Sequence, residues 1–589
     1  MADKLQLLLA MVGYMLIVIG IGVFFAKRSQ ANSGNYFLGG RSLGPWVAAM
    51  SAEASDMSGW LLMGLPGVAY WCGIADAAWT AIGLAVGTYL NWLLVSRRLH
   101  AYTVVSGDAI TVPDLLINRC REKEKVILVI SALFILIFFS IYAASCFVTC
   151  GKLFSGLFGY SYHSMMIVGA LFVLLYTVLG GFLAESTSDF MQAMVMIAAL
   201  VGVVVCGVVH AGGFSEVIEN AKSIPGYFSL TQIAQPVTDA NGVQQASGGA
   251  PLFGSAAPYG LLTILSTASW GLGYFGVPQV LLRFMAIRKG SELKRSRRIA
   301  TVWVVISLTA AVFIGVLGRY ILPTDPALAT QSGAENVFAN LSQLLFHPLL
   351  AGIVMAGILA ATISSSDSYL LIATSAVAKN LFGGVVRKNA TDRQIMVVSR
   401  VVLVAIALVG IAIAWDENSI IFEVVSFAWS GFGATFGPII LFSLFWQRVT
   451  RAGAIAGLPS GGICRFVWQL LLKPLGGVFG IYELLPAFLV SCLFIVAVSL
   501  STARPSDEIQ EEFERARIRR SRNPRITTRG EGNFFSGKLV CGYCSGAVVY
   551  NSSKDGHRYY RCHNRINLKN CKGVSVSEEL LKREILHEL

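Results

Sequence analysis

Apolar runs of about 20 residues recur along most of this 589-residue chain, and they constrain its fold more than any other feature. One such run spans the ~30 Å hydrocarbon core of a bilayer as a single α-helix. The composition agrees, because 13% of the residues are charged, whereas a soluble domain carries about 25%. The sequence therefore excludes an ordinary water-soluble protein and predicts a large all-α polytopic membrane domain.

Thirteen membrane spans are predicted from the apolar runs. They are 5–26, 44–69, 74–96, 126–151, 164–182, 189–211, 257–282, 299–321, 351–378, 396–414, 420–446, 452–472 and 479–500. The first has no small-residue cleavage site behind it and is interpreted as a retained helix. Clusters of Lys and Arg follow spans 1, 3, 7, 9 and 11. Because basic loops stay in the cytoplasm, we expect the N-terminus outside and the C-terminus inside.

Two predicted spans are poorly suited to be continuous helices. The first, 44–72, contains Glu53 and Asp56 together with serines, glycines and Pro66. The second, 257–282, contains three glycines and Pro278 in its second half. Spans 2–6 and 7–11 would form two repeats, and each interrupted segment would then open its repeat. Broken helices at matching places indicate an inverted-repeat transporter with its site at the breaks. The alternative is that these glycines only let helices pack closely.

A third polar stretch lies in span 9, where Ser364, Ser365, Ser366 and Asp367 follow one another. A carboxylate near the bilayer centre costs ~3 kcal/mol, so Asp56 should face a cavity or a cation. Hydroxyls and freed backbone carbonyls are the oxygen ligands that a hard cation such as sodium prefers. Alternatively, the serines hydrogen-bond to carbonyls of their own helix, as is common in membrane helices.

Four stretches of the chain closely resemble the sodium/solute symporter family, in particular the branch that carries proline. They are LGGRSLGPWVAAMSAEASDMSGWLLMGLPG (38–67), WGLGYFGVPQVLLRFMA (270–286), AGILAATISSSDS (356–368) and SFAWSGFGATFGPIILFSLFW (426–446). The resemblance extends from about residue 5 to about 515. It implies a leucine-transporter-type fold with a five-plus-five inverted repeat, no enzymatic activity, and sodium-coupled import of L-proline by alternating access across a bacterial plasma membrane.

The resemblance also implies roles for particular residues. The implied sodium ligands are the carbonyls of Ala54, Met57 and Ala361 and the hydroxyls of Ser364 and Ser365, with Asp56 beside them. The implied substrate residues are Tyr142, Trp270, Tyr274 and Pro278, with Trp60, Ser55, Ser58 and Gly59 nearby. A flat apolar wall with dipoles for both charges suits proline, a zwitterion with an apolar ring. Another small solute of the same family is the alternative substrate.

The C-terminal tail differs from the rest of the chain. The membrane domain is predicted at 1–503, followed by a charged cytoplasmic helix and linker at 504–533. Residues 501–589 hold 17 Lys and Arg against 11 Asp and Glu, so they supply much of the net charge of +13. Cys541 and Cys544 form a CxxC pair, and Cys562 and Cys571 follow. The CxxC pair can hold one face of a tetrahedral Zn²⁺, and the second pair of cysteines can close the site, with His557 and His563 as possible substitutes.

The segment 534–589 resembles the zinc β-ribbon of large serine recombinases. No recombinase activity is expected, because membrane spans occupy the place of the catalytic domain. The favoured explanation is a gene fusion caused by a mobile element. The competing explanations are a membrane-tethered DNA-binding protein and a solute sensor that signals through its tail. The local excess of Lys and Arg would give the ribbon only weak, salt-sensitive, non-specific contact with DNA.

Overall fold

The computed structural model describes residues 2–29, 33–387 and 389–521, and, nearer the C-terminus, residues 539, 541, 548–552, 558–562, 571, 575–577 and 579–581. The chain divides into two compact units, Met1–Arg522 and Asn523–Leu589. In the second unit, β5 (Val548–Ser552), β6 (Arg558–Cys562) and β7 (Ser575–Ser577) form an antiparallel sheet with the order β5-β6-β7.

The first unit is a helical membrane domain. Within the described residues, ten helices are long and apolar enough to cross a membrane. Three shorter apolar helices, Trp60–Cys72, Tyr162–Val178 and Leu261–Phe275, lie in predicted spans 2, 5 and 7. Span 5 is continuous with span 6 except at Gly181, where φ is 62° and ψ is 179°. The predicted polytopic helical fold is therefore confirmed.

The helices of this unit follow the predicted spans closely. Those that carry the spans are α1 (Ala2–Ser29), α3 (Pro45–Asp56), α4 (Leu65–Cys72), α5 (Ile74–Leu90), α8 (Val126–Phe158), α9 (Tyr162–His210), α11 (Leu261–Ala268), α12 (Pro278–Ala286), α13 (Leu293–Ile321), α16 (Pro348–Ser375), α17 (Asp392–Ile413), α18 (Ile421–Phe445), α19 (Arg451–Val467) and α20 (Leu484–Ser501). Helix α6 (Ser96–Val105) extends beyond predicted span 3, which ends at residue 96. The connecting helices are α2 (Ser33–Leu38), α7 (Val112–Cys120), α10 (Phe214–Ser223), α14 (Gln331–Ala334), α15 (Val337–Leu345) and α21 (Asp507–Ser521).

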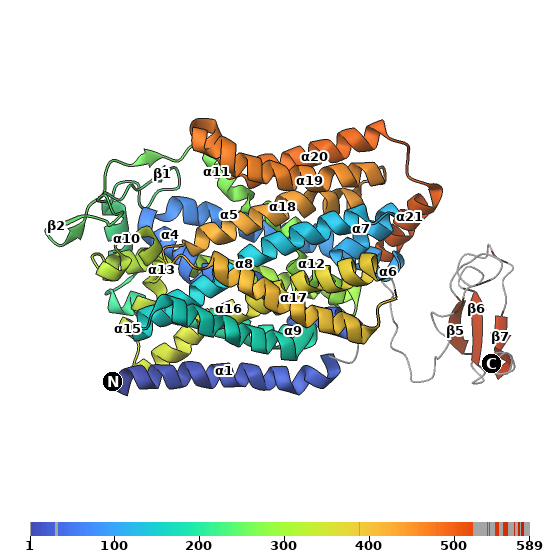
Figure 1. Cartoon of the computed structure of the whole chain (residues 1–589), viewed down its shortest axis with the longest axis horizontal. Coiled ribbons are helices and arrows are strands. Elements are labelled where there is room, and N and C mark those ends of the chain that lie inside the picture. The colour runs from blue at the N-terminus through green and yellow to red at the C-terminus, as the bar shows by residue number, and fades with distance from the viewer. Residues whose placement is uncertain are drawn as a thin grey trace. The chain divides into compact units, whose positions relative to one another are not determined.

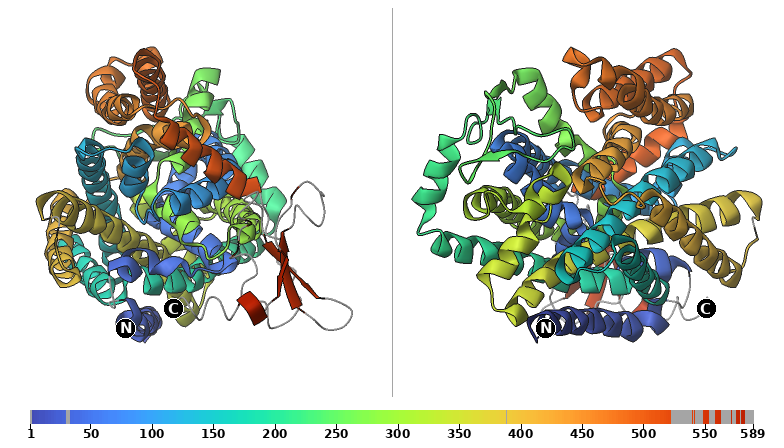
Figure 2. Two further views of the ribbon diagram at one scale, coloured as in Figure 1. Left: turned by 90° about the vertical axis from the view of Figure 1, so that its right-hand side faces the viewer. Right: turned by 60° about the vertical axis from the view of Figure 1, so that its left-hand side comes forward.

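The bundle has two distinct ends and two distinct edges. One end carries α10 and the short strands β1 (Gln232–Ile233), β2 (Ala246–Ser247), β3 (Ala250–Pro251) and β4 (Ala257–Pro258), and α21 lies at the other end (Figure 1). Helices α19 and α20 lie together at one edge, with α1 at the opposite edge (Figures 1 and 2). The first turn of α1 and α21 therefore lie at opposite ends of the membrane domain (Figure 1).

Glycines allow the first repeat to contact the second at the level of the backbone. A Cβ atom on Gly83 of α5 would lie 2.2 Å from the carbonyl oxygen of Ala268, and one on Gly87 would lie 2.4 Å from that of Gly271. Real Cβ atoms do not approach oxygen so closely, so only glycine fits at these two positions. The interrupted segment that begins with α11 is thus held tightly against α5.

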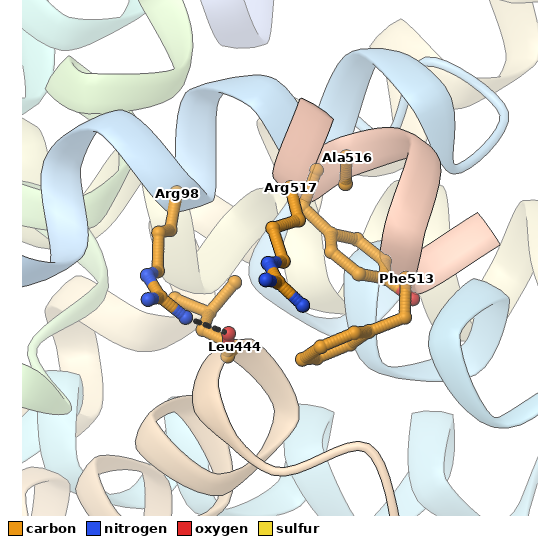
Figure 3. A pocket seen from close by; sticks show the side chains of 6 residues that line it. Arg98, Leu444, Phe513, Ala516 and Arg517 are labelled. Atoms are coloured by element: carbon orange, nitrogen blue, oxygen red, sulfur yellow. Dashed lines mark hydrogen bonds between the residues drawn. The ribbon is translucent and has the colours of Figure 1, made fainter. Parts of the chain in front are cut away.

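Helix α21 is charged overall, but it packs on the membrane domain. Its Phe513 and Ala516 are buried, and the Phe513 ring lies 6.4 Å from the Tyr102 ring of α6. Its Glu512 accepts a hydrogen bond of 2.6 Å from Arg121. Figure 3 shows Phe513, Ala516 and Arg517 of this helix lining a pocket together with Arg98 and Leu444. Arg98 donates a 3.0 Å hydrogen bond to the carbonyl of Leu444. The helix therefore packs on α6, and Arg121 ties it to the residue that follows α7.

This docking predicts different outcomes for two truncations. A chain that ends after Ser521 keeps all of α21 and should retain the thermal stability of the full membrane domain. A chain that ends after Pro505 loses the contacts of Phe513 and Ala516, and burial of one Phe side chain alone is worth about 2 kcal/mol. We expect thermal unfolding in detergent, followed by size-exclusion chromatography, to show a lower midpoint for the shorter chain only. Equal midpoints would contradict a stabilising role for α21.

Candidate functional site

The first interrupted segment breaks directly after Asp56. Met57 leaves the helical conformation with φ −85° and ψ 74°, and its N–H still donates to the carbonyl of Glu53. The N–H of Ser58 then donates to the carbonyl of Asp56 at 3.1 Å rather than to that of Ala54, its partner in a regular helix. The break therefore frees the Ala54 carbonyl for other partners.

Those partners come from α16, 310 residues further along the chain. The hydroxyls of Ser364 and Ser365 donate to the Ala54 carbonyl at 2.8 and 3.2 Å, and Ser364 lies 3.1 Å from the carbonyl of Ala361. All four residues are completely buried. The structure thus brings together four of the oxygen ligands that the resemblance implies for sodium. Met57 lies at the adjoining break. The serines are not limited to bonds within their own helix.

Asp56 connects this oxygen cluster to the aromatic residues. Its Oδ2 accepts a 2.6 Å hydrogen bond from the hydroxyl of Tyr274, and its backbone carbonyl accepts bonds from Trp60 Nε1 and the Tyr142 hydroxyl. Its Oδ1 is buried and has no hydrogen-bond partner among the residues that the structure describes. A completely buried carboxylate oxygen without a donor is a strong candidate to meet a cation.

The second interrupted segment is broken by its glycines and by Pro278. After α11 the chain makes a 3₁₀ turn over Ser269–Phe275, and Val277 is extended before Pro278 starts α12. Proline has no N–H, so it cannot bond the carbonyl of Tyr274 four residues earlier. Asn91 Nδ2 donates to that carbonyl instead, at 2.9 Å. Pro278 therefore contributes here through the backbone, by leaving the Tyr274 carbonyl to accept from a side chain of another helix.

Aromatic rings lie where the two broken helices meet. The Trp270 ring centroid lies 6.1 Å from that of Trp60, and its carbonyl accepts a 2.8 Å bond from Trp429 Nε1. On the other side, the Tyr142 ring stacks on that of Tyr369 at 4.1 Å. These rings form an apolar wall beside the carboxylate of Asp56.

The two serines of the first break differ in their surroundings. Ser58 lies at the break, and its buried hydroxyl finds no hydrogen-bond partner within the described part of the chain. Ser55 instead donates back to the carbonyl of Ala52 in its own helix. Of the two, Ser58 is the hydroxyl available to a ligand.

Gly59 lets the first break approach α8. A Cβ atom at this position would lie 2.3 Å from Thr149 Oγ1 and 2.6 Å from its Cγ2. We expect Gly59→Ala to lower the initial rate of solute uptake at least tenfold, because overpacking of a tight contact costs about 1–3 kcal/mol. Thr149→Ala in the same chain should restore part of the rate. Gly20→Ala is the control, since a Cβ there meets nothing within 4 Å. Wild-type uptake by Gly59→Ala would show that the contact does not matter.

A buried charge network lies one helical turn from the oxygen cluster, and the sequence analysis missed it. Arg283 of α12 contacts Glu185, Asp189 at 3.2 Å and the hydroxyls of Ser51 and Ser368 at 3.0 and 2.9 Å. Ser368 also donates to Glu185. Arg283 directly follows predicted span 7, and Glu185 falls between predicted spans 5 and 6. The available signal was the presence of ionisable residues directly beside apolar segments.

In the second unit, three of the four predicted zinc ligands converge. The Sγ atoms of Cys541, Cys562 and Cys571 all lie within 4.8 Å of one another, and those of Cys541 and Cys571 are 3.9 Å apart. In a tetrahedral site with Zn–S bonds of 2.3 Å, two sulfurs are about 3.8 Å apart. The described thiols therefore fit a zinc ion. Cys544, His557 and His563 lie outside the described residues.

Two different protein families match the two units of the chain. The family model of the sodium:solute symporter family matches residues 36–461, and that of the recombinase zinc beta ribbon domain matches residues 534–589. The sodium/proline symporter of Escherichia coli (strain K12) is 40% identical over 520 residues, which cover 88% of this chain and 97% of the relative. That of Staphylococcus aureus (strain USA300 / TCH1516) is 38% identical over 516 residues, covering 86% and 94%.

A solved structure supports the same fold. The substrate-bound, outward-open form of a Na⁺-coupled sialic acid symporter superimposes with a TM-score of 0.68 at 17% identity, covering 85% of this chain and 99% of that one. The match to the family model over residues 36–461 and the two bacterial relatives show that this chain belongs to the sodium:solute symporter family.

Proposed function

We propose that this chain imports L-proline together with sodium by alternating access. The observation that carries the proposal is the convergence of the two broken helices on α16, where Ser364 and Ser365 meet the Ala54 carbonyl and Tyr274 meets Asp56. The substrate follows from the sodium/proline symporters that are 38–40% identical to this chain over most of their length.

In the proposed mechanism, sodium binds between α3 and α16. The carbonyls of Ala54, Met57 and Ala361 and the hydroxyls of Ser364 and Ser365 would supply its oxygen ligands, and Asp56 would supply negative charge. Neutral oxygens with one nearby carboxylate suit a hard monovalent cation. Because the ligands come from two helices far apart in the sequence, sodium would hold the first break against α16.

Proline would bind next to this cation. Trp270, Tyr142 and Trp60 would contact its apolar ring, and Ser58 and the freed backbone groups at Gly59 would meet its charged groups. Tyr274 links the two ligands because its ring belongs to the aromatic wall and its hydroxyl donates to Asp56. Binding of sodium would therefore change the position of a residue that contacts proline, which is how the two binding equilibria become coupled.

Uptake of labelled proline into proteoliposomes tests the function. An inward sodium gradient should drive accumulation, and replacing sodium by potassium should abolish it. Uptake that is indifferent to sodium, or that occurs only with another solute, would contradict the proposal. Because basic loops tend to stay in the cytoplasm, we also propose that the end that carries α21 faces the cytoplasm of a bacterial cell and that the N-terminus lies outside. The variants Asp3→Cys and Asp507→Cys, each labelled with a thiol reagent from either side of the membrane, would check this orientation.

For the second unit we propose a zinc ribbon that plays no part in transport. The convergence of three thiols supports it, and thiolate ligands would give the ribbon a large share of its folding free energy through the metal. We expect the fragment 530–589 to bind one zinc ion per chain by mass spectrometry and to lose its far-UV circular dichroism signal when a chelator is added. A fold unchanged by the chelator would contradict a structural zinc site. Contact with DNA stays a prediction.

A further inference from the structure

We propose that Tyr482, in the loop between α19 and α20, closes the aromatic wall at Trp270 and thereby limits the size of the ring that the substrate site accepts. The inference deepens the proposed function and rests on it, because it takes Trp270 as a residue that contacts the substrate. Helices α19 and α20 correspond to predicted spans 12 and 13, which follow the two predicted repeats of five spans each. They would thus take part in substrate selection.

The two rings form a nearly parallel stack. Their centroids are 5.2 Å apart, and their planes differ by 18°. Trp270 is 3% exposed, whereas Tyr482 is only partly buried, so Tyr482 is the outer ring of the pair. A planar ring in this position prevents Trp270 from moving outward to accommodate a larger ligand.

Hydrogen bonds fix Tyr482 to both elements beside Trp270. Its backbone N–H donates to the hydroxyl of Ser266 on α11 at 2.6 Å. Its own hydroxyl donates to the carbonyl of Ser426 on α18 at 3.0 Å. Tyr482 is therefore attached through its backbone to α11, which leads into Trp270, and through its hydroxyl to α18. Helix α18 also carries Trp429, which donates to the Trp270 carbonyl.

The neighbouring residue anchors this loop inside the protein. Glu483 is 2% exposed and accepts hydrogen bonds from the Ser430 hydroxyl at 3.0 Å, Arg465 Nη2 at 3.3 Å and Lys473 Nζ at 3.2 Å. Arg465 is completely buried and lies over the Phe427 ring. A buried carboxylate with three donors cannot leave its place without losing all of them. The backbone at Tyr482 is thus held rigidly.

The test compares proline with its six-membered-ring homologue, pipecolate. The two compounds differ by one methylene, and a pocket discriminates such a difference by roughly 10- to 200-fold. We expect Tyr482→Ala to reduce the ratio of the two kcat/KM values about tenfold in proteoliposomes. Tyr482→Phe keeps the ring and should keep the ratio. The sodium concentration for half-maximal uptake at saturating proline should not change in either variant.

Phe479→Ala is the matched control, because Phe479 is an aromatic residue of the same loop that packs on Trp468. It should leave the ratio unchanged, and a fall in the ratio equal to that of Tyr482→Ala would contradict the proposal. An unchanged ratio in Tyr482→Ala would also contradict it. If that variant does not insert, Tyr482→Leu decides in the same way, with a smaller expected fall. A wild-type chain without sodium-driven proline uptake would refute the proposed function, which is a separate outcome.

Discussion

Asp56→Asn should raise the sodium concentration for half-maximal proline uptake on the order of 10- to 100-fold, because typical coupling free energies change an affinity by such factors. The substitution removes the negative charge from a buried carboxylate whose Oδ1 lacks a donor among the described residues, while the amide still accepts from Tyr274. At saturating sodium, the KM for proline should change much less. At limiting sodium it must rise, because the two ligands affect one another's affinity reciprocally.

Two further variants complete this experiment. Ser364→Ala removes one hydroxyl ligand and should shift the sodium dependence in the same direction by a smaller factor. Asp416→Asn makes the same chemical change in the exposed loop before α18 and should have no effect. Initial rates of labelled proline uptake over a sodium titration provide the measurement. Wild-type sodium dependence in both Asp56→Asn and Ser364→Ala would disprove the proposed sodium site.

Arg283→Met should destabilise the membrane domain by about 3–5 kcal/mol, because it leaves buried carboxylates without their counter-charge. Arg283 is completely buried between Glu185 and Asp189, and Asp367 lies in the same region with one oxygen that lacks a donor within the described residues. A lower midpoint of thermal unfolding in detergent, and a lower yield of inserted protein, are the measurements.

Neutralising the carboxylates as well should reverse this loss. Arg283→Met combined with Glu185→Gln and Asp189→Asn leaves no uncompensated charge in that triad, so we expect it to recover more than half of the lost stability. The control is Arg288→Met, which breaks an exposed pair with Glu292 and should leave the midpoint of thermal unfolding unchanged. An Arg283→Met protein as stable as the wild type would show that the network does not hold the helices together.

The sequence by itself determined the spans and their interruptions. Apolar length must match the bilayer, so a window of about 20 residues suffices to locate a spanning helix. Helix-breaking residues act locally as well. A proline such as Pro278 lacks a backbone N–H in any context, and the glycines before it weaken the same stretch of helix. The serine cluster at 364–366 was visible for the same reason, because its residues are adjacent.

Only the tertiary structure decided which distant groups meet. Arg283 and Glu185 are 98 residues apart, and nothing in the periodicity of either segment indicates that they pair inside the bilayer. Tyr482 falls at the start of the predicted span 479–500, and nothing in that apolar run indicates that its ring stacks on Trp270. The sequence predicts a charged cytoplasmic helix after residue 503, and only the structure shows that Phe513 docks this helix on α6. Such contacts depend on the three-dimensional packing of whole helices, and this packing follows from shape and charge complementarity between faces that no single segment contains.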